Sequence, residues 1–192
     1  INNASQTIGA YTGIQFAVGN NGDAAISAIR TGDGESALAF GTRGGGNRTE
    51  RMRIDFGGRI TTPSQPAFFA YMSAAQFTST GTIPFNTTLF NRGSNFNTST
   101  YRFTAPVTGV YWFNVILATD AATTWSLIPL YVNGGRYRDM METRTVPING
   151  EEHASTILQL TAGDYVEVYS GGGTIQGGGA NYYSSFQGYL IG

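Results

Sequence analysis

The most informative segment of the chain is residues 100–113, Thr100-Tyr101-Arg102-Phe103-Thr104-Ala105-Pro106-Val107-Thr108-Gly109-Val110-Tyr111-Trp112-Phe113. Its aromatic residues Tyr101 and Phe103 alternate with polar ones, which predicts a strand with one buried face. Residues 106–109 have the composition of a turn, and residues 110–117 are almost continuously β-branched, aromatic or aliphatic. We therefore predict a half-buried strand, a turn, and a second strand that is covered on both faces.

Around this segment the chain resembles the globular head of complement component C1q and the related tumour-necrosis-factor-like jelly rolls. The resemblance implies an all-β C-terminal jelly-roll β-sandwich that assembles as a homotrimer. The turn at Asn133-Gly134 lacks the Lys that often precedes it in that family, and the calcium-binding acids of some members have no clear match. The matching segments, in family order, are residues 66–71, 83–86, 103–113, 158–166 and 184–190.

The composition favours strands and excludes several classes of function. Gly accounts for 27 of the 192 residues, charged residues for only 12%, and Cys is absent. Such a chain favours short strands and tight turns, and it forms neither disulfides nor thiolate metal sites. The formal net charge of −1 disfavours a nucleic-acid partner, which needs a basic surplus. No run of about 18 apolar residues is present, so we expect no membrane insertion.

The first part of the chain is richer in Gly and Asn than the rest, and its apolar runs are shorter. We predict a β-rich fibre shaft segment at 1–61, a proline-containing linker at 62–66, and the jelly-roll head at 67–192. Such short strands hold too few large side chains to enclose a core, so we expect them to share one with other copies. The predicted shaft strands are 14–18, 25–29, 37–40 and 52–54.

A second resemblance supports the shaft. Residues 49–60, Thr-Glu-Arg-Met-Arg-Ile-Asp-Phe-Gly-Gly-Arg-Ile, are similar to segments found near the ends of bacteriophage tail-fibre shafts. Those segments often continue into Gly-Ile-Gly-Thr, whereas this chain continues into Thr61-Thr62-Pro63. We therefore expect the shaft to end here, before the head begins. The alternative interpretation is a surface hairpin whose Glu50 and Arg51 or Arg53 form solvated pairs of little energetic worth.

The residues required for catalysis are sparse. The single histidine, His153, lies two residues before Ser155, so the two would share one face of a strand, but no acid is placed to orient the ring. The neighbouring Glu151 and Glu152 would point to opposite faces. We therefore expect no catalytic site and no cofactor. A calcium site remains open where three copies would bring acids together on an axis, and the alternative is a solvated acidic turn.

We expect the binding surface on loops at the end of the head that lies away from the shaft, because function tends to concentrate on loops carried by a rigid scaffold. These loops are 119–124, 148–152 and 171–181, between predicted strands that include 109–118, 136–147 and 183–191. The candidate receptor-binding residues, chosen to stack on a sugar and to bond its hydroxyls, are Asp120, Trp125, Gln176, Asn181 and Tyr182. For Trp125 a core position is the alternative. A flank site at Arg136, Tyr137 and Arg138 is a second possibility.

Together these features predict an extracellular component of a virion: a phage tail-fibre tip that trimerises and binds a host cell-surface glycan or protein. The alternative function is a structural trimerisation cap that terminates a fibre and binds no receptor itself. A third alternative, a tailspike that degrades polysaccharide, would require paired carboxylates in a groove.

Overall fold

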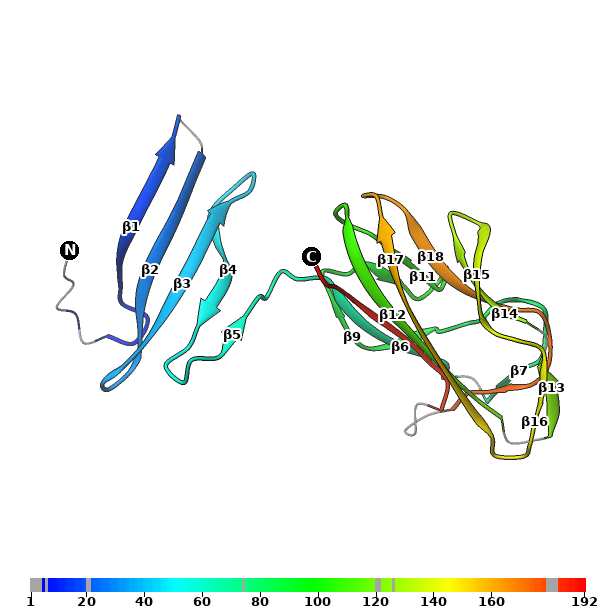
Figure 1. The fold of residues 1–192 in the computed structure, drawn as a ribbon. Helices are drawn as coiled ribbons and strands as arrows, with labels where there is room; N and C mark the ends of the chain where they lie inside the picture. Colours follow the sequence, from blue (N-terminus) through cyan, green and yellow to red (C-terminus); the bar gives the residue numbers. More distant parts are fainter. Residues whose placement is uncertain are drawn as a thin grey trace. The chain divides into compact units, whose positions relative to one another are not determined.

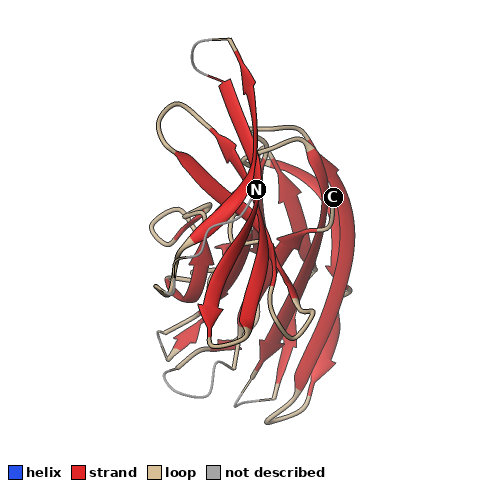
Figure 2. Ribbon diagram, turned by 90° about the vertical axis from the view of Figure 1, so that its left-hand side faces the viewer, coloured by secondary structure: helices blue, strands red, loops and turns tan. Residues whose placement is uncertain are grey.

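The structure is a computed structural model of the chain, and it describes residues 5, 7–19, 22–73, 75–119, 122–125, 127–178 and 183–192, with the side chain of residue 125 excluded. Every regular element in these residues is a β-strand, which confirms the all-β prediction (Figure 2). The chain divides into two compact units, Ile1–Ser64 and Gln65–Gly192, and each is described by itself.

The N-terminal unit is an antiparallel meander in which each strand pairs with the next one in the chain (Figure 1). Gly34, Gly45 and Gly58 occupy turns with positive φ, which glycine adopts without steric cost. The predicted strands lie inside these longer ones. Our expectation of shorter strands was wrong because backbone pairing continues through Gly, Ser and Thr, which side-chain patterns do not mark. The strands are β1 (Tyr11–Val18), β2 (Gly22–Gly32), β3 (Glu35–Arg43), β4 (Arg48–Ile54) and β5 (Ile60–Thr61).

The C-terminal unit, here called the head, is a sandwich of two antiparallel sheets (Figure 1). In the first sheet β12 (Gly109–Ala118) lies between β17 (Glu151–Leu160) and β20 (Ser185–Leu190). The sheet continues through β6 (Ala67–Tyr71) to β9 (Thr87–Arg92), and β19 (Ile175–Gln176) and β7 (Gln76–Phe77) extend it at one end.

The second sheet has the order β10-β11-β18-β14-β15, with β8 paired to the end of β18. A short separate pair is formed by β13 (Thr123–Trp125) and β16 (Arg144–Val146). The single strand predicted at 136–147 is therefore divided between β15 and β16. The strands of the second sheet are β8 (Gly81–Thr82), β10 (Phe96–Asn97), β11 (Arg102–Thr104), β14 (Ile128–Val132), β15 (Gly135–Met141) and β18 (Tyr165–Ser170).

Phenylalanine rings fill the space between the two sheets. Phe68 lies at the centre, with its ring centroid 4.8 Å from that of Phe96 and 5.0 Å from those of Phe103 and Phe186. Burying each such ring contributes about 1.5–3 kcal/mol. The alternation of β12 places Tyr111, Phe113, Val115 and Leu117 in this core, whereas the residues between them are half-buried. The prediction that this strand is covered on both faces was therefore wrong for the single chain, because its second face lies on the outside of the sandwich. Burial raises the pKa of the Tyr111 hydroxyl, which donates to the Val107 carbonyl at 2.6 Å.

Two turns hold each other at one end of the sandwich. The Ala105 backbone accepts a hydrogen bond from the Gly163 N–H and donates one to the Asp164 carbonyl, each at 2.8 Å. The Asp164 carboxylate accepts from the Asn133 side chain at 2.8 Å and from the Thr161 N–H at 2.7 Å. Asn133 has a φ of 53° in the predicted Asn-Gly hairpin turn. The turn between β11 and β12 is thus fixed from across the head.

Gly188 of β20 gives a direct test of this packing. A Cβ atom there would lie 2.6 Å from Cδ1 of Phe113 and 2.8 Å from the Trp112 carbonyl oxygen. We predict that Gly188→Ala destabilises the head by about 1–3 kcal/mol, measured by denaturant unfolding. The control is Gly135→Ala, whose nearest atom would be at an ordinary 3.5 Å. Equal stability of the two variants would contradict the close approach of β12 and β20.

Asp164 predicts an acid-sensitive turn. The hydrogen bonds from Asn133 and Thr161 lower the pKa of its carboxyl group. A lowered folded-state pKa gives stability that is complete above the unfolded value of about 3.9 and is lost as the pH falls through the folded value. We predict that wild type unfolds at a higher temperature than Asp164→Ala at neutral pH, and that this gap narrows in thermal scans as the pH falls below about 4. A gap independent of pH would contradict this role.

Candidate functional site

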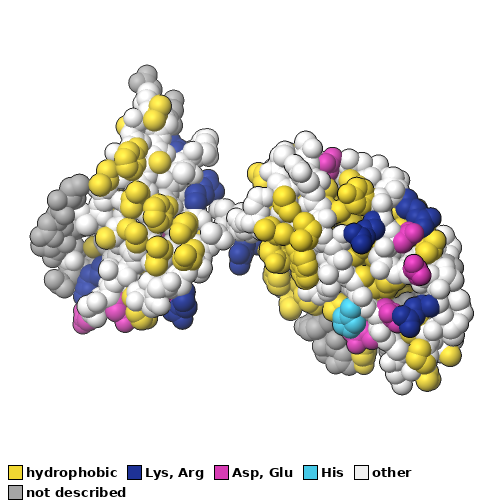
Figure 3. Space-filling model, viewed as in Figure 1, with side chains coloured by type: hydrophobic (Ala, Val, Ile, Leu, Met, Phe, Trp, Pro, Cys, Tyr) yellow, Lys and Arg dark blue, Asp and Glu magenta, His cyan; other side chains and the backbone are white. Residues whose placement is uncertain are grey.

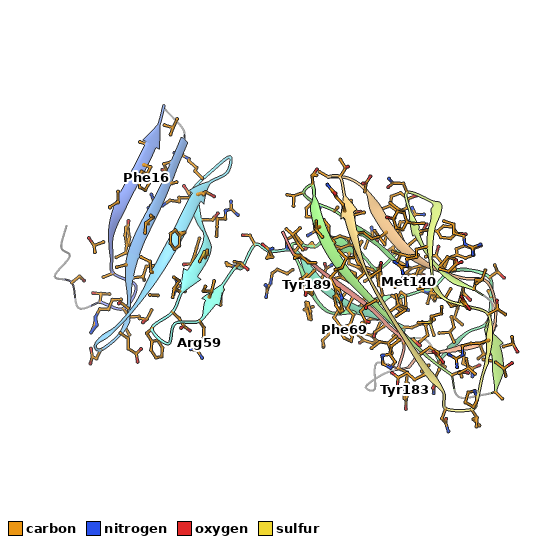
Figure 4. The ribbon with its side chains drawn as sticks, viewed as in Figure 1. Phe16, Arg59, Phe69, Met140, Tyr183 and Tyr189 are labelled. Carbon is orange, nitrogen blue, oxygen red and sulfur yellow. The ribbon has the colours of Figure 1, made fainter. Side chains whose placement is uncertain are left out.

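The outer face of the first sheet of the head carries large apolar side chains, and the described residues of the head leave several of them exposed. Cross-strand pairing aligns Ile157, Trp112 and Tyr189 in one row, and Phe69 with Phe90 in the next. Ile157 is 60% exposed, Phe90 49% and Tyr189 46%. The rings of Trp112 and Tyr189 lie 5.4 Å apart. We call these five residues the head face, and Figures 3 and 4 show hydrophobic side chains gathered there.

Polar residues share this sheet surface with the hydrophobic ones. Asn114 of β12 pairs with Ser155 of β17 and Gln187 of β20, between the row that contains Trp112 and the row that contains Ile116. An isolated cluster of exposed aromatic and aliphatic side chains, rimmed by polar ones, is the usual surface of a protein–protein contact. The head face is therefore the strongest interaction surface of the head.

The N-terminal unit has a second apolar face. Register places Ile14, Ile26, Phe40 and Met52 in one row across four strands, and Leu38, Ile54 and Ile60 in the next. The opposite face carries small and charged residues and two larger apolar ones, Tyr11 and Ile29, which lie in one row with the buried Ala37. Residues of the first face stay exposed in the single chain, with Ile14 at 54%. We call these seven residues the N-terminal face, and Figure 3 shows hydrophobic side chains over this unit.

A single sheet of this kind is not self-sufficient. Its one apolar side is left in water unless another layer covers it, because a β-sheet is stable when that side packs against a second element. On the opposite side, Glu50 pairs with Arg53 at 2.6 Å, and the Arg53 hydrogen bond lowers the pKa of Glu50. Charged residues lie on this opposite side, whereas most of the large apolar side chains of the sheet lie on the N-terminal face, so we expect the covering layer on the N-terminal face.

The three predicted binding loops meet at one end of the head. The Thr119 N–H donates to the Gly150 carbonyl at 3.0 Å, and the Thr174 N–H donates to the Thr123 hydroxyl at 3.1 Å. This end lies at the Ala118 end of β12. The C-terminus lies at the other end, where the Val110 N–H donates to the Gly192 carbonyl.

The individual loop residues stay predictions. Gln176 is half-buried and belongs to β19, where it pairs with Ala118 and Gln76, so its backbone is fixed in the first sheet. The backbone of Trp125 pairs with Arg144, and its side chain lies outside the description, which leaves both interpretations of this residue open. Asp120, Asn181 and Tyr182 lie outside the described residues.

The outer face of the second sheet contains two polar and aromatic clusters. In one, Arg102 lies 2.9 Å from the buried carboxylate of Glu167, and its guanidinium covers the Tyr165 ring at 4.2 Å. The hydrogen bond to Glu167 raises the pKa of Arg102. In the other, the parallel rings of Tyr131 and Tyr169 lie 4.9 Å apart beside an open cavity of about 340 Å³.

The residues considered for chemistry are engaged in separate pairs. His153 Nε2 lies 3.4 Å from the Glu151 carboxylate, and Glu152 pairs with Arg144 at 3.0 Å, so the neighbouring glutamates have different partners. Among the described residues, no three His, Cys, Asp or Glu side chains gather to hold a metal ion. The calcium site on an axis would draw acids from three chains and stays a prediction. In the same residues, no helix has the length and hydrophobicity to span a bilayer.

Sequence reasoning found part of these surfaces. It predicted the strand at 183–191, and the structure places Tyr189 of this strand on the head face. It missed Ile157, Phe90 and the pair of Tyr131 with Tyr169. The alternation along β17 could have predicted that Ile157 is exposed. The tyrosine pair could not be predicted in this way, because it depends on the register between β14 and β18.

Comparison with known proteins covers the head. A family model described as the C1q domain matches residues 67–191. The chain is 32% identical over 113 residues to Caprin-2 of Danio rerio, covering 57% of this chain and 12% of that protein. It is 28% identical over 127 residues to complement C1q tumor necrosis factor-related protein 3 of Mus musculus, covering 66% of this chain and 51% of that protein. It therefore spans about half or less of the length of these curated relatives.

Two solved structures are similar over the same region. The globular domain of zebrafish complement 1qA protein has 21% sequence identity and a TM-score of 0.46, and the match covers 67% of this chain and 98% of that one. Murine APRIL at pH 8.5 has 9% identity and a TM-score of 0.48, with 66% and 99% of the two chains covered.

Proposed function

The chain belongs to the C1q domain family through residues 67–191, and we propose that it is the homotrimeric tip of a phage tail fibre that attaches the virion to its host. In this proposal the head binds a glycan or protein on the cell surface, and the N-terminal sheet forms the end of the fibre shaft. The protein acts outside the cell, as part of the virion, and binds without catalysis.

The observation that carries the proposal is the pair of uncovered apolar faces. The head face and the N-terminal face both leave large side chains in water in a single chain, Ile157 and Ile14 among them. Burying apolar area contributes about 25 cal/mol per Å², so these faces favour association of identical chains. A threefold arrangement covers both kinds of face at once and matches the trimer that the jelly-roll resemblance implies.

The tail-fibre context rests on residues 49–60, whose sequence is similar to the ends of phage fibre shafts. In the structure they form β4 and β5 with the connecting turn, next to the place where the N-terminal unit ends at Ser64. A trimer also repeats any weak receptor site three times, and simultaneous engagement strengthens binding by about 10²–10⁴-fold when geometry permits. An attachment protein that meets a surface covered with repeated sugars gains most from this effect.

The alternative function is a trimerisation cap that sets the register of the fibre while another protein finds the host. The same two apolar faces support this alternative function, because a cap has to assemble but does not need a receptor site on the head. The two functions differ in whether the assembled chain binds cells.

We predict that Ile157→Glu abolishes the trimer while the single chain stays folded. The side chain is exposed in one chain, so the charge costs little there, whereas burying an unpaired carboxylate at a subunit contact costs several kcal/mol. Light scattering should give about three times the 20.5 kDa chain mass for wild type and less for the variant. The control is Tyr137→Glu, which is 61% exposed on the second sheet and should stay trimeric. A trimeric Ile157→Glu would refute this interface.

A matched pair tests the N-terminal face. Ile14 and Gln15 are adjacent exposed residues of β1 whose side chains point to opposite faces of the sheet. We predict that Ile14→Lys makes the N-terminal unit more sensitive to limited proteolysis, because its three copies no longer pack, whereas Gln15→Lys leaves the digestion pattern of wild type unchanged. Equal effects of the two changes would show that this face is not a subunit contact.

The attachment function predicts that the labelled full chain binds intact bacteria of some strains in a panel, and that Ile157→Glu binds the same strains at least tenfold more weakly because avidity is lost. Flow cytometry gives the measurement. If the trimer binds none of the strains infected by phages that carry this fibre, and deleting the head disrupts the shaft, the cap function replaces the proposal.

A further inference from the structure

We propose that the cavity on the outer face of the second sheet of the head binds a neutral pyranose sugar. This inference deepens the proposed attachment function, on which it rests, by naming the ligand class and a site on the flank instead of the end loops. The cavity has a volume of about 340 Å³ and is lined by Pro129, Tyr131, Arg136, Thr143, Tyr169 and Gly171 among others. We call it the flank cavity.

The first requirement of a sugar site is a flat apolar surface, because one side of a pyranose ring presents C–H groups that pack on an aromatic ring. Tyr131 and Tyr169 stack on each other, with ring planes that differ by 5° and centroids 4.9 Å apart, so the outward ring face of this stack is the surface that a sugar would pack on. They come from β14 and β18, which are directly paired at Tyr131 and Glu167. Both tyrosines are half-buried. The sheet therefore holds the two rings in place without a ligand, which lowers the ordering cost of binding.

The second requirement is a set of donors and acceptors that matches adjacent hydroxyl groups. Arg136 lines the cavity and donates to both oxygens of Asp139, from Nε at 2.8 Å and from a terminal nitrogen at 2.6 Å. Such a planar pair presents donors and acceptors side by side, as two neighbouring hydroxyls require. The Thr143 hydroxyl adds a further donor and acceptor in the lining.

Charge decides between neutral and acidic sugars. The guanidinium of Arg136 is already paired with the Asp139 carboxylate, so the cavity offers no unpaired positive charge from this residue to an anionic ligand. An acidic sugar would also be repelled by Asp139. A neutral ring with adjacent hydroxyls is the class of ligand that fits this combination of rings and balanced charges, and a cavity of this size falls within the range of about 300–1,000 Å³ typical of small-ligand sites.

The sheet also offers matched controls. Tyr137 and Arg138 lie on β15 beside Arg136, are exposed, and are not among the residues that line the flank cavity. They repeat the chemistry of Tyr131 and Arg136 outside the cavity, so a change at either removes the same type of side chain from the same sheet. Arg136→Gln alters a side chain that is 49% exposed, so it tests the site even if Tyr131→Ala fails to fold.

The experiment measures binding of methyl glycosides of glucose, galactose, mannose and N-acetylglucosamine to the full chain by saturation-transfer NMR, with methyl glucuronide as the acidic comparison. We expect at least one neutral glycoside to bind with millimolar affinity and methyl glucuronide to bind more weakly. Tyr131→Ala and Arg136→Gln should each weaken binding of that glycoside at least tenfold, whereas Tyr137→Ala and Arg138→Gln should leave it within twofold of wild type. Thermal unfolding verifies the fold of each variant.

Three results would overturn the site: no neutral glycoside binds, the acidic glycoside binds more tightly, or folded Tyr131→Ala and Arg136→Gln variants bind like wild type. The same variants in the cell-binding assay separate this inference from the proposed function. Cell binding that persists in both variants removes the flank cavity as the receptor site and leaves attachment intact. Glycoside binding by a wild-type chain that binds no cells supports the site and removes attachment.

Discussion

β12 carries large apolar side chains on both sides, and the described residues of the head bury only one of these sides completely. Its inward residues, such as Phe113, are part of the ring cluster between the two sheets, while Trp112 lies in an outer row with Ile157 and Tyr189. The close approach at Gly188 fixes β20 against β12, and the paired turns at Ala105 and Gly163 fix the entry to the strand. These contacts hold the strands of the apolar face in place. We expect the exposed side chains of this face to pack against another chain.

The N-terminal sheet also has an exposed apolar face. Its described residues form a single layer, and most of its large apolar side chains lie on one side because the register aligns Ile26 with Phe40 and Phe40 with Met52. The proposed association of identical chains would cover the apolar faces of both units. In this proposal, assembly uses the first sheet of the head and leaves the second sheet, with its tyrosine pair and Arg136, open to a ligand.

Much of the fold could be predicted from sequence, and the limits have physical causes. The apolar run after Gly109 predicted β12, and Asn133-Gly134 predicted a hairpin turn. The strand predicted around Phe103 is β11, but Tyr101 lies outside it in a turn with a φ of 61°. β9 was missed because Leu89 and Phe90 are adjacent and a register shift opposite Phe69 breaks the alternation. Sequence reasoning named Arg136 in a possible flank site, and this residue lines the flank cavity. It did not find Tyr131 and Tyr169, because these two residues meet only through strand register. The end loops were placed together correctly, while most of the residues chosen there lie outside the description.

The most direct test of the account is the mass of the wild-type chain in solution as it is diluted into the nanomolar range, followed together with its near-ultraviolet circular dichroism. The account predicts a species of three chains whose near-ultraviolet signal changes when the trimer dissociates, because Trp112 and Tyr189 then pass from the subunit contact into water. A single folded chain of 20.5 kDa with an intact aromatic signal at all concentrations would contradict it.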